Sequence, residues 1–358
     1  MCFEGPLRLV LKNIQAPRTV PDKGKYGYGT CNRCNRAEHI KCHLHLSQPW
    51  SKTPTVKATL IPICIVIFVR IVTVCSLACG QTQPVLIGVL EDHPGHFAGE
   101  PDYRAVRVAF YQVGERWEAF PGDCSDQDCL KTIATKYPRQ VNWTIAFDGR
   151  ELGTVAGSTP DAFDSYSSVG QQVVTSKNIP TVGQPSREFG GFLDKPVYRP
   201  LIAVSQPNYR DPEGWRREEL SATLAPAIRQ QFRQRFPRVM NCTKGHVANA
   251  RPWSYQDNNI TVHKTYASKR GWVIAEVVLS PYRCDGPLDE PFTSQWFAVT
   301  PRHEVRLLGS GMSLVDVGDY NGDGKSELVF SIDDYNHGGY RLFYDHFRRS
   351  AVFQFNYH

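Results

Sequence analysis

The stretch Leu314-Val-Asp-Val-Gly-Asp-Tyr-Asn-Gly-Asp-Gly-Lys-Ser-Glu-Leu-Val-Phe330 places a loop of oxygen-bearing side chains and glycines between two apolar segments. The segment 328–332 after the loop has the apolar, aromatic pattern of a β-strand. Within the loop, Asp319, Asn321 and Asp323 stand two residues apart, so a tightly turned backbone directs all three side chains toward one centre. The sequence therefore predicts two strands joined by a ligand-binding loop.

The residue types of this loop predict a Ca²⁺ site. Glu327 supplies a further carboxylate, and Lys325 supplies its backbone carbonyl while its ammonium stays in solvent. Gly322 and Gly324 have no Cβ, so they let the backbone curl around an ion. Three carboxylates around one turn repel one another without a cation. The alternative is a plain turn, because Asp and Asn side chains also bond to their own backbone.

A helix-loop-helix EF-hand does not fit these residues. Its twelve-residue loop ends in a bidentate glutamate. Counted from Asp319, the twelfth position is Phe330, which cannot bind a cation. The segment 328–332 also has a strand pattern and not that of a helix start.

The pattern Gly318-Asp-x-Asn-Gly-Asp-Gly-x-x-Glu327, followed by apolar residues, resembles the FG-GAP or VCBS repeat, the calcium loop of integrin-α-type β-propellers. The resemblance covers residues 314–330 and occurs once, whereas propellers of this family usually carry several such loops. The family usually has Asp where this chain has Glu327. The resemblance implies a calcium loop within one blade-like sheet.

Beyond residue 80, short apolar or aromatic runs alternate with Gly, Pro, Asn and Asp. This pattern predicts a mainly β fold of antiparallel sheets, with a propeller-like arrangement as one form of it. We expect a β-rich region at 81–205 and a second region at 206–358 that holds the loop. The predicted strands lie at 84–90, 105–111, 141–147, 271–278, 295–299, 304–308, 339–344 and 351–355.

One kinked amphipathic helix is also predicted. Asp211-Pro-Glu-Gly-Trp215 combines a capping residue, a proline and an early glutamate, which is a helix start signal. Pro226 should kink or split the helix near Thr223, and Pro237 should end it. Its basic side is either solvated or contacts a partner or a membrane surface. The apolar positions that recur every four residues are Leu220, Leu224, Ile228, Phe232 and Phe236.

The apolar run at 58–79, with Arg70 at its centre, predicts a signal peptide within 56–80. Cleavage is expected before Cys79 or Gln81, which makes the mature protein secreted or periplasmic. Two alternatives are lipidation at Cys79 and an uncleaved membrane anchor at 58–79. We interpret residues 1–55 as an extension that is not translated, with initiation near Val56.

Four cysteines follow the apolar run, an even number that suits an oxidising compartment. We expect the pairs Cys124 with Cys129 and Cys242 with Cys284, although four cysteines allow three pairings. The alternative is four buried free thiols. Cysteines and histidines also lie between residues 31 and 45, but their spacing does not favour a zinc site.

The apparent basic character comes from the N-terminal part. Residues 1–80 carry 11 Lys and Arg against 3 Asp and Glu, which leaves 30 basic and 32 acidic residues beyond them. The exported part is therefore about neutral, and nothing in its composition points to nucleic-acid binding. The oligomeric state does not follow from the sequence.

No catalytic motif has diagnostic spacing. His93 and His96 in Glu91-Asp-His-Pro-Gly-His96 form the best local cluster for metal binding or proton transfer. We expect an exported, calcium-stabilised β-rich protein that binds a protein or a glycan. The alternatives are a secreted hydrolase with a structural calcium site, whose paired carboxylates would come from distant strands, and a structural protein of the cell envelope.

Overall fold

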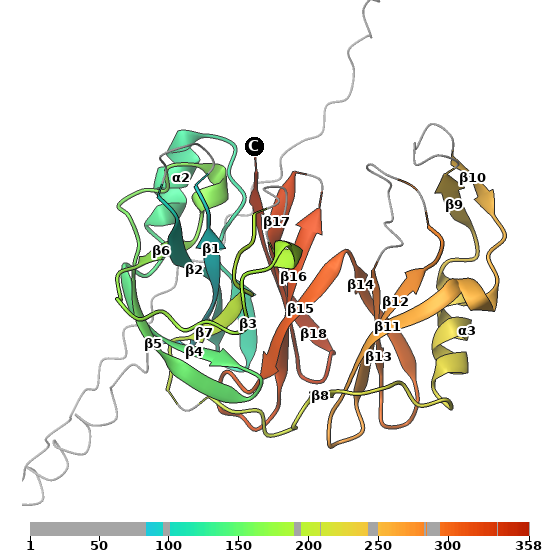
Figure 1. The fold of residues 1–358 in the computed structure, drawn as a ribbon. Coiled ribbons are helices and arrows are strands. Elements are labelled where there is room, and N and C mark those ends of the chain that lie inside the picture. Colours follow the sequence, from blue (N-terminus) through green and yellow to red (C-terminus); the bar gives the residue numbers. More distant parts are fainter. Residues whose placement is uncertain are drawn as a thin grey trace, which may run out of the picture. The chain divides into compact units, whose positions relative to one another are not determined.

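The computed structural model describes residues 84–95, 101–189, 195–207, 209–242, 250–282, 284, 294–334 and 336–357, all within one compact unit, Gly80–His358 (Figure 1). The extension 1–55, the signal region 56–80 and His96 lie outside the described residues. None of the described helices has the length and apolar character needed to cross a membrane.

The first sheet closes into a six-stranded barrel, because β1 pairs with β2 on one side and with β7 on the other. Closure leaves no free edge among these six strands. A seventh strand, β3, extends the sheet from β2. The strand order is β1-β7-β4-β5-β6-β2-β3, with bounds β1 Leu86–His93, β2 Tyr103–Val113, β3 Arg116–Ala119, β4 Gln140–Phe147, β5 Arg150–Ser158, β6 Gln171–Val174 and β7 Leu201–Val204.

A short helix that the sequence analysis did not anticipate, α2 (Gln127–Ala134), packs on this part of the chain. The Asp126 carboxylate caps it by accepting a bond of 2.8 Å from the Cys129 N–H. The disulfide Cys124–Cys129 is formed, as expected. Two 3-10 helices follow, η1 Tyr166–Ser168 and η2 Arg187–Phe189.

The second sheet has the order β14-β13-β12-β11-β8 and is antiparallel throughout. The helix α3 (Ala225–Arg235) covers it, and Phe232 lies 6.2 Å from the Phe297 ring of the sheet. Beside it, β9 (Val239–Cys242) and β10 (Ala250–Trp253) form a hairpin whose Cys242 is bonded to Cys284, the second expected disulfide. The remaining bounds are β8 Arg216–Arg217, η6 Asp257–Asn259, β11 Ile260–Ala267, β12 Val273–Leu279, β13 Gln295–Val299 and β14 Val305–Ser310.

The predicted helix start at Asp211 is wrong. Residues 211–215 form a turn in which the Asp211 carboxylate accepts the N–H groups of Glu213 and Trp215. Gly214 has φ +59°, a left-handed conformation that does not continue a helix. The chain then enters β8, and α3 begins only at Ala225. Pro226 lies in the first turn of α3, where proline is tolerated, so the break predicted near Thr223 marks the start of the helix.

The third sheet is a meander of four consecutive antiparallel strands, as the sequence predicted for the C-terminal region. Alternate side chains of its strands enter different cores: Val329 packs in the core shared with the barrel, whereas Leu328 and Phe330 pack against residues of the second sheet. This sheet therefore has two buried faces. Its strands are β15 Met312–Gly318, β16 Glu327–Asp334, β17 His337–Tyr344 and β18 Arg349–Asn356.

The mainly β, antiparallel fold predicted from the sequence is confirmed. Among the described residues, β11 to β14 and β15 to β18 follow one another in the order of a propeller blade, whereas the first sheet is closed. The boundary predicted near residue 206 falls between β7 of the barrel and β8 of the second sheet.

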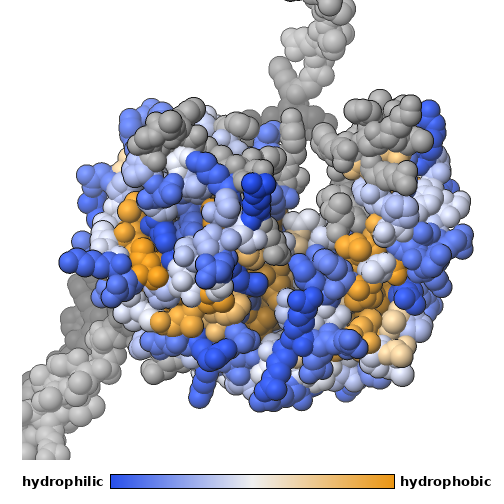
Figure 2. Space-filling model, viewed as in Figure 1, coloured by the Kyte–Doolittle hydropathy of each residue, from blue (hydrophilic) through white to orange (hydrophobic). Residues whose placement is uncertain are grey.

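The face of the molecule drawn in Figure 2 is mainly hydrophilic, with hydrophobic residues in several separate areas. A single extended apolar surface would favour a protein interface. Because the hydrophobic areas on this face are separate, we look for a functional site in loops and pockets. The large apolar side chains of highest exposure are Tyr103, Val113, Leu152, Val173, Met240 and Val352.

Candidate functional site

The loop 319–326 joins the end of β15 to the start of β16, and Gly318 pairs with Glu327 across its base. Gly322 and Gly324 have φ values of +76° and +84°. Glycine adopts this left-handed conformation without the steric penalty of a Cβ. The two glycines thus take left-handed conformations, and the chain makes a compact loop between paired strands.

Asp319 organises the loop through its backbone contacts. Its Oδ1 accepts the N–H groups of Gly322 at 2.7 Å and Asp323 at 3.1 Å, and its Oδ2 accepts that of Gly324 at 2.9 Å. Asn321 Oδ1 also accepts the Asp323 N–H, at 3.1 Å. Asp323 Oδ1 accepts the Lys325 N–H at 2.8 Å. These bonds are the ones that a plain turn of Asx residues would make.

Glu327 is a buried carboxyl group, 2% exposed, at the far end of the loop. Its Oε2 accepts the Tyr320 N–H at 2.9 Å. Burial raises the pKa of Glu327 to about 8; the bond from the Tyr320 N–H opposes this rise, and the charges of Asp323 and Asp319 add to it. Burial likewise raises the pKa of Asp319, and the charge of Asp323 adds to that shift. The loop therefore concentrates acidic groups in a poorly solvated place, where each favours binding a proton or a cation.

The fit of these residues to Ca²⁺ is good in chemistry, because all side-chain donors are oxygen. In the described part of the chain, however, no three His, Cys, Asp or Glu side chains lie close enough together to hold a metal ion. The loop oxygens instead face backbone N–H groups. A carboxylate has about four lone-pair sites, so accepting N–H bonds leaves capacity for a cation. The Lys325 ammonium lies 3.5 Å from an Asp345 oxygen, away from the loop carboxylates.

Tyr209 and Asp316, which the sequence analysis did not single out, support the loop from beneath. The Tyr209 hydroxyl lies 2.9 Å from Oδ2 of Asp316 and 2.7 Å from the Val317 carbonyl oxygen. Burial raises the pKa of Asp316 to about 7, although the N–H of Asp148 and the hydroxyl of Tyr209 favour its charged form. The sequence feature that could have identified Asp316 is its position between two valines of a strand.

Gly318 lets Tyr209 take this position. A Cβ at Gly318 would lie 2.1 Å from a ring carbon of Tyr209, far closer than van der Waals contact allows. The glycine that opens the loop motif is therefore needed for side-chain packing, in addition to any role in the turn.

Segments distant in sequence hold the loop in place. The Asp319 N–H donates to the Arg210 carbonyl at 2.9 Å, and the two residues form an antiparallel bridge. The Ser326 hydroxyl donates to Asp211 at 2.7 Å. Asp211 was predicted to cap a helix, and it caps a turn and binds this loop instead.

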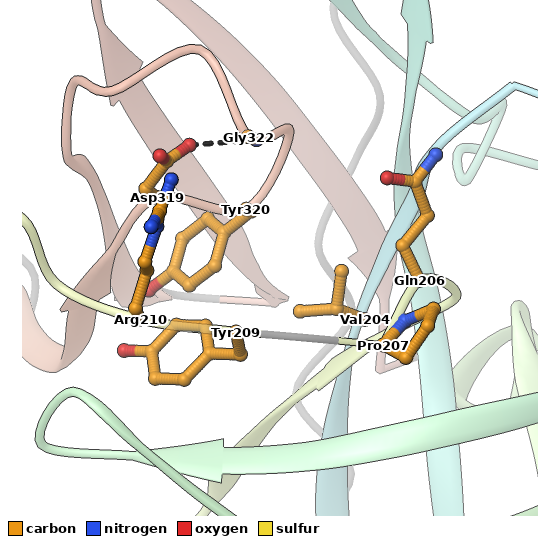
Figure 3. A pocket seen from close by; sticks show the side chains of 8 residues that line it. All are labelled: Val204, Gln206, Pro207, Tyr209, Arg210, Asp319, Tyr320 and Gly322. Atoms are coloured by element: carbon orange, nitrogen blue, oxygen red, sulfur yellow. Dashed lines mark hydrogen bonds between the residues drawn. The ribbon is translucent and has the colours of Figure 1, made fainter.

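A pocket of about 280 Å³ adjoins the loop. In Figure 3, Tyr209, Arg210, Asp319 and Tyr320 lie on one side of it and Gln206 on the other. The rings of Tyr209 and Tyr320 are stacked, with centroids 5.6 Å apart. The lining residues are Val204, Gln206, Pro207, Tyr209, Arg210, Asp319, Tyr320 and Gly322.

The histidine cluster predicted at 91–96 takes part in a buried ionic network. His93 Nε2 lies 3.0 Å from Glu91, whose carboxylate also binds Arg107 at 2.9 Å and the hydroxyl of Tyr340. Burial raises the pKa of Glu91, but the charges and hydrogen bonds of Arg107 and His93 together hold it well below its usual range. These contacts link β1 and β2 to β17. Glu91 therefore has a structural role. His96 lies outside the described residues.

No family model matches the chain, and no curated protein or solved structure shows significant similarity to it.

Proposed function

We propose that the protein is an exported calcium-binding β-rich protein of the binding or adhesion type, with Ca²⁺ held by the loop 319–327. The observation that carries the proposal is the charge of this loop. Asp319 and Glu327 are 3% and 2% exposed, and in the described part of the chain neither of them, nor Asp323, forms an ion pair with a basic side chain. Buried carboxylates without a positive partner favour binding either a proton or a cation.

The chemistry of the loop supports Ca²⁺ over other ions. Asp319, Asn321, Asp323 and Glu327 offer oxygen atoms, and the Lys325 carbonyl offers another, whereas zinc and copper sites usually include His or Cys. A bound cation would replace repulsion between the carboxylates with attraction. It would thereby stabilise the connection between β15 and β16.

Two features support export. The disulfides Cys124–Cys129 and Cys242–Cys284 are compatible with an oxidising compartment outside the cytoplasm. The apolar run before residue 80 adds the sequence signal for export. The mature protein would then meet extracellular calcium, and its exposed loops would meet protein or glycan ligands.

The test is thermal unfolding in calcium and in chelator. At a calcium concentration of about one hundred times its dissociation constant, we expect about 2.7 kcal/mol of added stability, seen as a higher midpoint. Asp323→Ala should lose most of this gain. Asp161→Ala, which alters an aspartate whose side chain is 94% exposed and far from the loop in sequence, should keep it. An identical midpoint for the wild type in calcium and chelator would refute the proposal.

A further inference from the structure

The pocket beside the loop has an apolar floor and a polar, basic rim. Val204, Tyr209 and Tyr320 are buried, whereas Gln206 and Arg210 are exposed. In the described part of the chain, the Arg210 guanidinium has no ion pair with a carboxylate. Asp319 lies beside it across the bridge but outside ion-pair distance, so the guanidinium can still pair with an anionic group that enters the pocket.

The fold fixes where this charge stands. Arg210 and Asp319 face each other in the antiparallel bridge, so their side chains lie on the same face. Figure 3 shows both on the same side of the pocket. The amide of Gln206 lies across from them, where it can donate or accept a hydrogen bond. A ligand in the pocket would thus contact a cation on one side and an amide on the other.

We propose that this pocket binds a sugar that carries a carboxylate, such as the uronic acid unit of a glycan, with Arg210 paired to the carboxylate. Guanidinium and carboxylate groups match in a bidentate geometry. A volume of about 280 Å³ equals that of roughly nine water molecules. That space suits one monosaccharide, and it is larger than a simple anion requires. Hydroxyl groups of the sugar would face Gln206, and its C–H face would lie on the apolar floor.

Calcium in the loop would strengthen this binding, and this part of the inference rests on the proposed function. Asp319 lines the pocket and its negative charge opposes an anionic ligand. A cation bound by Asp319 cancels that charge and leaves Arg210 dominant. Because such coupling is reciprocal, the acidic sugar would also tighten calcium binding by the same factor.

The experiment is calorimetric titration of the exported part with glucuronate, glucose and acetate, in calcium and in chelator. Glucose matches the size of the sugar without its charge, and acetate supplies the charge without the ring. We expect glucuronate in calcium to bind at least tenfold more tightly than either control, and at least tenfold more tightly than in chelator. Arg210→Gln should weaken glucuronate binding at least tenfold. The matched variant Arg217→Gln, at an exposed arginine of β8, should leave it unchanged.

The two proposals fail in different ways. Calcium-dependent melting of Arg210→Gln tests the loop without the cation of the pocket, and a retained calcium shift also shows that this variant is folded. Should calcium stabilise the protein while glucuronate binds no better than acetate or glucose, the sugar pocket is overturned and the calcium loop stands. Equal glucuronate affinity in calcium and chelator overturns the coupling. Glucuronate binding that survives in Arg210→Gln overturns the role of Arg210.

Discussion

Glu91 is partly buried and Glu327 is buried, both on strands, yet their surroundings move their pKa values in opposite directions. Glu91 contacts Arg107, His93 and Tyr340, and its pKa lies well below the usual range. Glu327 is surrounded by other acidic groups, and its pKa rises to about 8. Burial by itself raises the pKa of both carboxyl groups. The two pKa values therefore differ because Arg107, with a further contribution from His93, stabilises the charge of Glu91, whereas Glu327 has no such basic neighbour in the described part of the chain.

The comparison separates a structural acid from one that is suited to bind a ligand. The charge of Glu91 is already neutralised by the protein, so an added cation would gain little there. In the described part of the chain, no acidic side chain of the loop 319–327 forms an ion pair with a basic side chain. A cation would therefore find its strongest attraction at the loop, and the following variants test that contrast.

The largest effect is expected for Arg107→Met. It leaves Glu91 buried without its main partner, which should lower the free energy of unfolding by about 3–5 kcal/mol. Urea denaturation at pH 7 measures this loss. The double variant Arg107→Met with Glu91→Gln removes the charge as well as its partner and should recover much of the stability. A single variant as stable as the wild type would show that the ion pair is not structural.

Removing one tyrosine hydroxyl from each region gives the next largest effect. Tyr340→Phe removes a hydrogen bond to the charged Glu91 and should cost about 1.5–3 kcal/mol at both pH 5 and pH 8. Tyr209→Phe should cost a similar amount at pH 8 but less at pH 5, where Asp316 is protonated, because its pKa is about 7. Denaturation curves at the two pH values measure both. If both variants lost the same stability at pH 5 as at pH 8, the proposed difference between a charged Glu91 and a protonated Asp316 at pH 5 would be contradicted.

In chelator, stability should fall as pH rises. The pKa of Asp316 increases from 3.8 to about 7 on folding and that of Glu327 from 4.5 to about 8, so the folded state binds more protons than the unfolded state between these values. Their contribution is thus complete below pH 4 and is lost as pH rises toward 7 and 8. Each group adds a slope of up to about 1.4 kcal/mol per pH unit.

Denaturation midpoints at pH 5, 6 and 7 measure this slope. Asp316→Asn should reduce it by about half, whereas Asp161→Asn, at an exposed site, should leave it unchanged. A wild-type protein whose stability in chelator rises over this range would show that the acidic groups of the loop region are compensated after all.

The smallest effect is expected for Glu327→Gln in chelator at pH 8.5. The substitution removes a buried charge that lacks a basic partner, so we expect a loss of less than about 1 kcal/mol, or a gain. The same variant should gain no stability from calcium. For comparison, Glu91→Gln leaves Arg107 unpaired and should be clearly destabilised. A large loss for Glu327→Gln in chelator would mean that the loop depends on this carboxylate without any metal.

Local sequence patterns predicted the features that depend on neighbouring residues along the chain, namely strands and turns. Alternating apolar residues gave the strands, and the glycines at 322 and 324 adopt the left-handed conformations that the motif requires. The expected disulfide pairs, one of the three pairings that the four cysteines allow, are confirmed by the structure. The helix start at Asp211 was misjudged because its capping signal also suits a turn, and Gly214 favours the turn.

The sequence by itself determined an antiparallel β protein and a loop of oxygen donors between two strands, since these depend on local conformation and residue type. It favoured the observed pairing of the cysteines, but the structure decided among the three pairings. Only the tertiary structure decided that Arg107 neutralises Glu91, that nothing basic in the described residues neutralises Glu327, and that Arg210 stands beside Asp319 at a pocket. The reason is physical: pKa values and binding depend on burial and on the charges within a few ångströms. Some of those neighbours come from segments more than a hundred residues apart, as with Tyr209 and Asp316. Glu91 and Arg107 are 16 residues apart and meet because β1 pairs with β2.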